Sequence, residues 1–437
     1  MDKLTSASAS AKVTGALVAP PSGDSQVYSS GSVDPATNHP AVKAAAESLG
    51  TYVHFPWCIR KCPYCDFLSV PSALQDIPHR AYADAVVREL EARRAELGER
   101  QLRSVFFGGG TPSLWKPAEL GRVLRAIREA FAGPDDVEVT VECNPGSLSV
   151  AHARALLDVG VNRLSIGVQA LDESRLRFLG RWHSAGQALA ALEAALAAGM
   201  PRVSGDLIFG VCGQTPEEAA SEVRQLIEVR VQHISAYALT IEPQTAFGAL
   251  ARKGRLPRAP EEAVADSFLA VDAELGSSGF EHYEISNYAR PGQRAEHNLG
   301  YWRGLEYVGL GCGAYGTVQR GDERVRYRNR PQPQGYMTTA VELDVARPGA
   351  LRMLETETEL LSADVRMSES LMLGLRLSEG VDVEAAALAS GALMWTPARR
   401  SAVQRLKSRG QLAHDGPRLS IPKASWLFAD GIISQLI

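Results

Sequence analysis

Three cysteines lie within eight positions near residue 60, at a spacing that suits iron–sulfur chemistry. Cys58, Cys62 and Cys65 follow the pattern C-x3-C-x2-C. Three thiolates can ligate three irons of a cubane cluster and leave the fourth iron open to a small chelating ligand. A structural zinc site instead needs four nitrogen or sulfur ligands. His54 is a nearby candidate for the fourth, but it precedes the loop, so the spacing predicts a [4Fe–4S] cluster rather than zinc.

The other cysteines and the composition narrow the class of protein. Cys143, Cys212 and Cys312 have no ligand spacing, and a lone cysteine is commonly a buried small hydrophobe. Their scatter does not resemble a disulfide framework, so reduced thiols and a metal centre predict a cytoplasmic location. No run of about 18 apolar residues occurs, and we therefore expect no transmembrane helix.

The charge balance gives no reason to expect a nucleic acid partner. The chain of 437 residues has 46 basic and 50 acidic side chains, a net charge of −4. Arg399, Arg400 and Arg405 begin a basic stretch near the C-terminus that a DNA-binding helix could carry. A solvated helix face explains this stretch better in a chain that is acidic overall.

The elements that must position the cysteine loop alternate between strand and helix patterns. Six short apolar runs are mostly followed by amphipathic stretches, which predicts parallel strands with crossover helices. Six such units favour an α/β fold built on a partial (β/α)6 barrel over a doubly wound sheet. The runs are Thr51–Phe55, Ser104–Phe107, Val137–Val141, Arg163–Val168, Val203–Phe209 and His233–Leu239.

Changes in composition predict four parts. Residues 1–46 are rich in Ser, Ala, Pro and Gly, which predicts a disordered tail. Residues 47–290 hold the barrel, and residues 291–360 are expected to be a linking segment. Residues 361–437 look mainly helical, with a hairpin centred on Asp415 and Gly416, and predict a small winged-helix-like module.

Glycines and a carboxylate follow the second and third predicted strands, at the edge where ligands bind in parallel α/β folds. Gly108, Gly109 and Gly110 would let backbone approach a ligand closely and expose N–H groups, although a tight turn is the alternative. Glu142 could accept hydrogen bonds from ribose hydroxyls, and a capping or salt-bridge role is its alternative.

The cysteine loop, the run from Gly108 to Pro112, and Gly167 to Gln169 together resemble one branch of the radical S-adenosylmethionine (SAM) proteins. That branch includes oxygen-independent coproporphyrinogen III dehydrogenase and the HemW-type heme chaperones. The resemblance runs from about residue 50 to the C-terminus and implies a radical SAM barrel, a [4Fe–4S] cluster and bound SAM. It assigns no catalytic residue. The positions that it implies contact SAM are Tyr52, Tyr64, Gly109, Gly110, Thr111, Glu142, Gln169, Arg181 and Asp206.

For Gln169, Arg181 and Asp206, a purely structural role at the barrel mouth is left open. Asp206 lies in an apolar run, where a buried charge needs a partner.

Two features separate the members of this branch. The dehydrogenase carries a fourth cysteine at the position held here by Phe67, and residues 297–302 match the H-N-x-x-Y-W motif of the chaperones. The resemblance therefore implies a heme-binding protein that passes heme to apo-proteins such as respiratory cytochromes. It makes His297 a candidate iron ligand; aromatic packing with a hydrogen-bonded His297 and no iron is the alternative. Peripheral contact with a membrane is compatible with this interpretation, and the alternative function is the dehydrogenase reaction in porphyrin biosynthesis.

Overall fold

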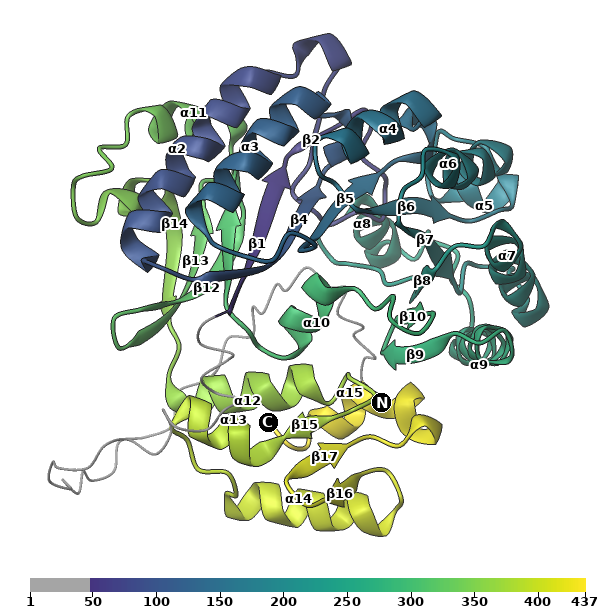
Figure 1. Cartoon of the computed structure of the whole chain (residues 1–437). Helices are drawn as coiled ribbons and strands as arrows, with labels where there is room; N and C mark the ends of the chain where they lie inside the picture. Colours follow the sequence, from purple (N-terminus) through teal and green to yellow (C-terminus); the bar gives the residue numbers. More distant parts are fainter. Residues whose placement is uncertain (1–47) are drawn as a thin grey trace, which may run out of the picture.

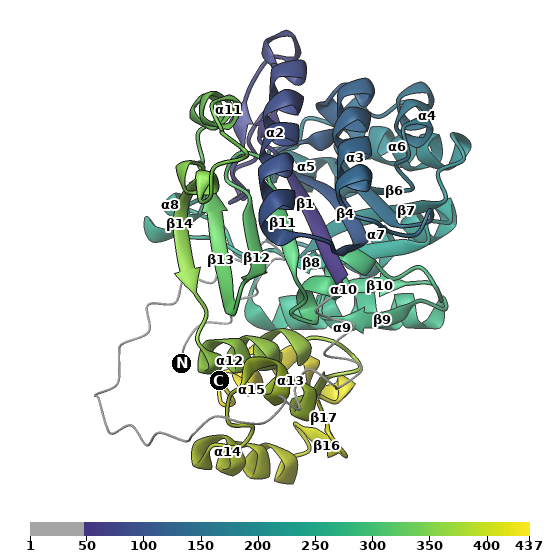
Figure 2. The same ribbon diagram turned by 60° about the vertical axis from the view of Figure 1, so that its left-hand side comes forward.

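The computed structural model describes residues 48–437, which form a large curved sheet flanked by helices and a smaller C-terminal module (Figures 1 and 2). The predicted tail, residues 1–46, lies outside the described residues. Within residues 48–437 no helix is both long enough and apolar enough to cross a membrane.

Six parallel strands form the centre of the sheet and confirm the partial (β/α)6 arrangement. Each strand pairs in parallel with the next along the chain. The strands are β1 (Ser48–Phe55), β4 (Gln101–Gly109), β5 (Glu138–Cys143), β6 (Arg163–Gln169), β7 (Arg202–Phe209) and β8 (His233–Ala238). The intervening and following helices are α2 (His79–Leu97), α3 (Pro117–Ala130), α4 (Val150–Asp158), α5 (Glu173–Phe178), α6 (Ala185–Ala197), α7 (Pro216–Val229), α8 (Ala246–Arg252) and α9 (Glu261–Ser277).

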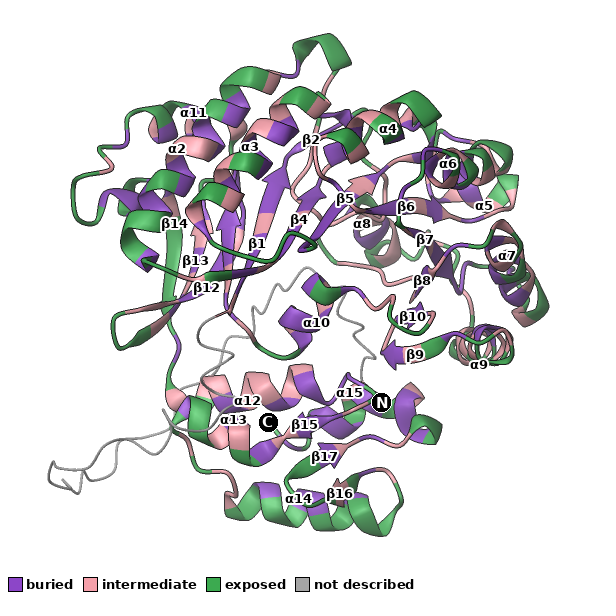
Figure 3. Cartoon of the chain, in the orientation of Figure 1, coloured by how far each residue is buried: buried purple, intermediate pink, exposed green. Residues whose placement is uncertain are grey.

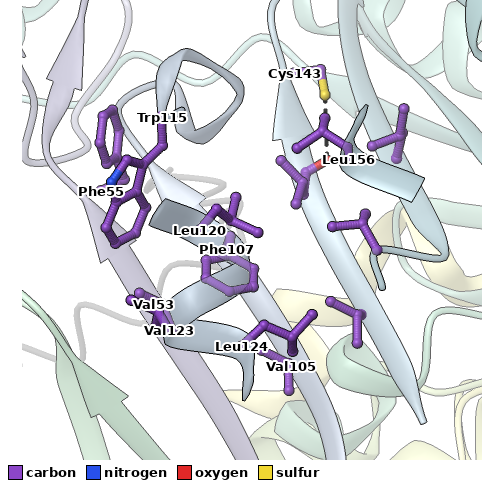
Figure 4. Packing of buried hydrophobic residues seen from close by; sticks show 14 of the residues in the cluster. Val53, Phe55, Val105, Phe107, Trp115, Leu120, Val123, Leu124, Cys143 and Leu156 are labelled. Atoms are coloured by element: carbon purple, nitrogen blue, oxygen red, sulfur yellow. Dashed lines mark hydrogen bonds between the residues drawn. The ribbon is translucent and has the colours of Figure 1, made fainter. Parts of the chain in front are cut away.

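Alternating side chains explain why these strands sit under helices. One face of β1 and β4 is apolar and packs against α3, as Figure 4 shows for Phe55, Phe107 and Leu124. Phe55 stacks on Trp115 with ring centroids 5.2 Å apart. The opposite face of the central sheet carries polar groups, such as Glu142 on β5 and Asp206 on β7. In Figure 3 the central strands are mostly buried while the helices expose their outer sides. The polar groups are thus held inside the curved sheet.

Further strands extend the sheet at both edges. Beyond β8 lie β10 (Asn287–Ala289) and β9 (Glu281–Glu284), both antiparallel. Beyond β1 lies β11 (Tyr307–Leu310), which is parallel to it. Residues 291–360, expected to be a linking segment, therefore contribute to the main sheet. They contain α10 (Glu296–Trp302), β11, β12 (Tyr315–Arg320), β13 (Glu323–Asn329), α11 (Pro333–Val341) and β14 (Glu355–Leu360).

The C-terminal module has its own hydrophobic core, which includes Leu371, Leu406, Leu419 and Trp426. The predicted hairpin is present, and a third short strand completes its sheet. This order of helices and hairpin agrees with the winged-helix-like expectation. The elements are α12 (Ala363–Gly374), β15 (Val381–Asp382), α13 (Val383–Ser390), α14 (Pro397–Ser408), β16 (Ala413–Asp415), β17 (Arg418–Ser420) and α15 (Ala429–Ile433).

Candidate functional site at the barrel mouth

The cysteine loop follows β1 and is closed at its base by backbone pairing. The short strands β2 (Trp57–Cys58) and β3 (Val70–Pro71) run side by side. Val70 N–H donates to Pro56 O at 2.7 Å, and Cys65 N–H donates to Cys62 O at 3.1 Å. The three thiols are free of disulfides. The sequence thus places three thiols on one closed loop at the carboxyl end of β1.

His54 is fully engaged by its neighbours and cannot complete a zinc site. Its Nε2 donates to Leu68 O at 2.8 Å, so Nδ1 is the acceptor for the Tyr52 hydroxyl at 2.9 Å. Burial lowers the pKa of His54 to about 4, which keeps the ring neutral. The loop therefore offers three thiols, a set of potential ligands that suits a cluster with one open iron.

Two of the loop thiols have raised pKa values, and the three thiols are not arranged around a common point. Burial raises the pKa of Cys65 to about 11 and also raises that of Cys58. Among residues 48–437, no group of three or more His, Cys, Asp or Glu side chains is already arranged to hold a metal ion. Cluster binding would therefore release protons from Cys58 and Cys65 and turn the side chains of the loop toward the irons.

Arg181 lies against the cysteine loop. Its Nη1 is 3.5 Å from Cys62 Sγ, and its Nη2 donates to Gly167 O at 3.0 Å. Its Nε is buried and has no hydrogen-bond partner among the described residues. Gln169 ends β6 in the left-handed region, at φ 69°, where the pairing with β7 shifts register. A residue in this strained backbone region is often found at a ligand site.

A cleft of about 490 Å³ opens beside this loop. It is bounded by the loop, by the end of α5 and by the start of α8. Its lining residues are Arg60, Lys61, Cys62, Pro63, Cys65, Arg177, Phe178, Gly180, Gln244, Thr245 and Ala246. Tyr64, between two of the cysteines, is half-buried, and its ring lies 6.5 Å from that of Phe247.

The glycine run serves packing, which corrects the expectation of exposed N–H groups. Gly109 N–H donates to Glu142 Oε2 at 3.1 Å, and Gly110 N–H donates to Phe55 O at 2.7 Å. Thr111 N–H donates to Trp57 O at 2.8 Å. A Cβ at position 110 would lie 2.5 Å from Trp57 O. The glycines are needed because the β4 turn passes directly against the chain that enters the cysteine loop.

Two carboxylates face the barrel interior with perturbed pKa values. Burial raises the pKa of Glu142 to about 7, and the Asp206 charge adds to this while Gly109 N–H opposes it. Burial also raises the pKa of Asp206, which accepts hydrogen bonds from Ser165 Oγ at 2.8 Å and Ser204 Oγ at 3.1 Å. The serines supply the partners that a buried Asp206 requires, whereas Glu142 keeps one oxygen without a protein donor among the described residues.

His297 lies at the opposite end of the barrel and is enclosed. Its ring nitrogens are hydrogen-bonded to Ser104 Oγ at 2.9 Å and Tyr301 OH at 3.0 Å, and Phe106 stacks on it at 5.0 Å. The residue is 2% exposed. Figure 1 shows α10, which carries His297, between the sheet and the C-terminal module. This geometry matches the packing alternative; iron ligation would require the ring of His297 to leave these partners.

Other residues behave differently from the sequence expectations. Cys143 and Cys312 are buried as expected, but Cys212 is exposed, so the expectation was wrong for that residue. Tyr82, which the sequence did not single out, donates from its hydroxyl to His54 O at 2.5 Å and accepts from Cys312 N–H at 2.9 Å. It lies on an apolar helix face, where nothing local distinguishes it from a core residue.

Comparisons with known proteins identify both parts of the chain. Residues 52–226 match the model of the radical SAM superfamily, and residues 361–428 match that of the HemN C-terminal domain. The heme chaperone HemW of Mycobacterium tuberculosis is 32% identical over 392 residues, which covers 90% of this chain and 95% of the relative. HemW of Haemophilus influenzae is 38% identical over 296 residues, covering 66% and 76% respectively.

The solved structure of HemN, the coproporphyrinogen III oxidase of Escherichia coli, has the same fold. It superimposes with a TM-score of 0.72 at 21% identity, over 90% of this chain and 92% of that one. The cysteine loop, the six-stranded core and the two family matches all indicate a radical SAM protein. The chain belongs to the HemW family of radical SAM proteins.

Proposed function

We propose that this protein is a cytoplasmic heme chaperone that binds heme and transfers it to apo-proteins such as respiratory cytochromes. The observation that carries the proposal is its 32% identity to a heme chaperone over nearly the whole length of both chains. The proposal includes a [4Fe–4S] cluster on Cys58, Cys62 and Cys65, since three free thiols share one loop and His54 is engaged elsewhere.

SAM would bind beside the cluster, at the ends of β4 to β7. When bound, the cluster and SAM together supply one-electron chemistry. Glu142 presents a carboxylate oxygen for ribose hydroxyls, and Arg181 presents an unpaired Nε for a carboxylate. The other proposed SAM contacts are Tyr52, Tyr64, Gly109, Gly110, Thr111, Gln169 and Asp206. The glycines would act by close approach of backbone, because their N–H groups are already used.

The proposal includes His297 as an iron ligand of the bound heme, provided that its ring gives up its present hydrogen bonds. The ring would have to leave Ser104 and Tyr301, and each hydrogen bond lost costs about 0.5–1.5 kcal/mol. If His297 ligates iron, Tyr301→Phe removes one competing bond and should tighten heme binding by about twofold to tenfold. Heme titration followed through the Soret band measures this change.

The outcomes of that titration separate three cases. Tighter binding in Tyr301→Phe together with a changed Soret band in His297→Ala supports ligation by His297. Heme binding that neither substitution alters would leave a carrier with another ligand. Absence of heme binding by the reconstituted wild-type protein would contradict the proposal as a whole.

The dehydrogenase is the second candidate, and Phe67 argues against it at the position of that enzyme's fourth cysteine. We expect no conversion of coproporphyrinogen III to protoporphyrinogen IX by the cluster-loaded protein with SAM and reductant. Product analysis by chromatography tests this. Clear SAM-dependent decarboxylation would overturn the carrier function.

A further inference from the structure

Three exposed cations surround the cleft that contains the cysteine loop. Arg60 and Lys61 lie between the first two cysteines, and Arg177 faces them from α5. None of the described residues that line the cleft carries a carboxylate. Within residues 48–437, none of these three side chains forms an ion pair; Lys61 Nζ donates only to the neutral Phe67 O, at 3.0 Å. The mouth of the cleft is therefore a patch of uncompensated positive charge.

This pattern contrasts with the surrounding surface. Two residues before Arg177, Arg175 is paired with Glu218 at 3.3 Å and with Glu222 at 3.2 Å. Asp66 is on the cysteine loop but does not line the cleft. The whole chain is acidic, with a net charge of −4. A local positive patch on an acidic protein attracts an anionic partner to that place.

We propose that Arg60, Lys61 and Arg177, the cationic rim, dock an acidic one-electron carrier protein that reduces the cluster. The inference rests on the proposed function, since it requires the loop to hold a cluster. One electron leaves the reduced carrier and enters the oxidised cluster, with no bond made or broken.

The position of the rim favours a protein over a small anion. Arg60 and Lys61 belong to the same loop as the cluster ligands, so a partner that contacts them lies beside the cluster. Ile59, next to them, is 39% exposed and offers an apolar contact within the charged patch. A protein interface commonly surrounds an apolar contact with charges, which mainly raise the association rate.

The test uses the reconstituted holoprotein and reduced flavodoxin, a small acidic flavoprotein, as the probe. The rim variant carries Arg60→Glu, Lys61→Glu and Arg177→Glu. The control variant carries Arg400→Glu, Arg405→Glu and Arg409→Glu, which reverses three exposed charges of the C-terminal module. Both variants change the net charge equally, so only a local effect distinguishes them.

We expect the second-order rate constant of cluster reduction to fall at least about tenfold in the rim variant at low ionic strength, and by much less in the control variant. The difference should shrink as salt is raised to about 0.5 M, because screening removes the attraction. The midpoint potential of the cluster, and its reduction by a neutral photoreductant, should match the wild type.

Several results would overturn the inference. Equal rates in all three proteins would remove the docking role. A shifted midpoint potential would assign the rim to stabilising the cluster, and a weakened heme affinity would assign it to the carboxylates of heme. If the rim variant does not assemble its cluster, the affinity of flavodoxin for the apo-proteins is measured instead. An affinity of the rim variant equal to that of the control variant contradicts the docking surface. A wild-type protein that holds no iron and sulfide would instead contradict the proposed function.

Discussion

Glu142 offers a quantitative test of the site, because its pKa lies within the pH range that can be used without acid or alkaline unfolding. The folded protein holds this pKa at about 7, against an ordinary value of 4.5. Between these two values the folded state binds the proton more tightly than the unfolded state. The contribution of Glu142 to the free energy of unfolding therefore falls as pH rises from about 4.5 to 7, and it is constant below and above this range.

The size of the effect follows from the shift. Each unit is worth 1.36 kcal/mol, and partial exposure of Glu142 reduces what is realised, so about 1–3 kcal/mol is expected. Glu142→Gln keeps the shape and removes the titration. The measurement is the urea unfolding of the apo-protein at pH 5.5 and pH 8. Wild type should lose stability relative to Glu142→Gln at the higher pH.

The same group should govern SAM affinity in the opposite direction. Ribose hydroxyls donate best to the ionised carboxylate, and a pKa of about 7 leaves that form scarce at pH 6. SAM binding should therefore tighten by about tenfold from pH 6 to pH 8 in wild type and stay flat in Glu142→Gln. Identical pH profiles for the two proteins, in both unfolding and SAM binding, would refute the reasoning and return Glu142 to a structural role.

Three further predictions concern the loop and its support. Replacing any one of the three loop cysteines by alanine should abolish the content of about four irons and four sulfides per chain. Replacing any of the three scattered cysteines should leave this content intact. The iron, sulfide and zinc content of each protein tests this, and zinc in place of iron would contradict the cluster. His54→Ala should lower cluster retention, because it removes the hydrogen bond to Leu68 O, and His54→Gln should partly restore it. Retention in His54→Ala equal to that of the wild type would show that this hydrogen bond does not support the loop. Gly110→Ala should disrupt cluster assembly, because the added Cβ would lie 2.5 Å from Trp57 O. Gly276→Ala in α9, whose Cβ would have no atom within 4 Å, should instead stabilise the protein by about 1 kcal/mol. Thermal unfolding and the iron content of each variant test these two expectations.

The six central strands could be predicted because burial on both faces or under helices leaves short apolar runs in the sequence. The strands β13 and β14 could not, since they alternate charged residues and are held by cross-strand ion pairs. Arg326 pairs with Glu359 at 3.0 Å, and Arg328 pairs with Glu357 at 2.6 Å. Such a stretch has the composition of a polar connection, so residues 291–360 look like a linking segment until their partners are known.

The candidate site was predictable where spacing along the chain sets the chemistry, as in the cysteine loop. It was not predictable where contacts join distant residues. The ring of His297 is hydrogen-bonded to Ser104, which is 193 positions away in the sequence, and the motif alone does not show this contact. The glycine N–H groups likewise depend on Phe55 and Trp57, whose proximity follows from the register of β1 with β4.

The measurement that tests the central claim most directly is heme transfer from the loaded protein to an apo-cytochrome. The holoprotein, with its cluster assembled and one heme per chain, would be mixed anaerobically with an apo-cytochrome b and followed through the Soret band. A heme chaperone predicts that the cytochrome spectrum develops while the donor loses its heme, and that heme bound to albumin transfers more slowly. Heme that remains on this protein, or that reaches the cytochrome no faster than from albumin, would contradict the account.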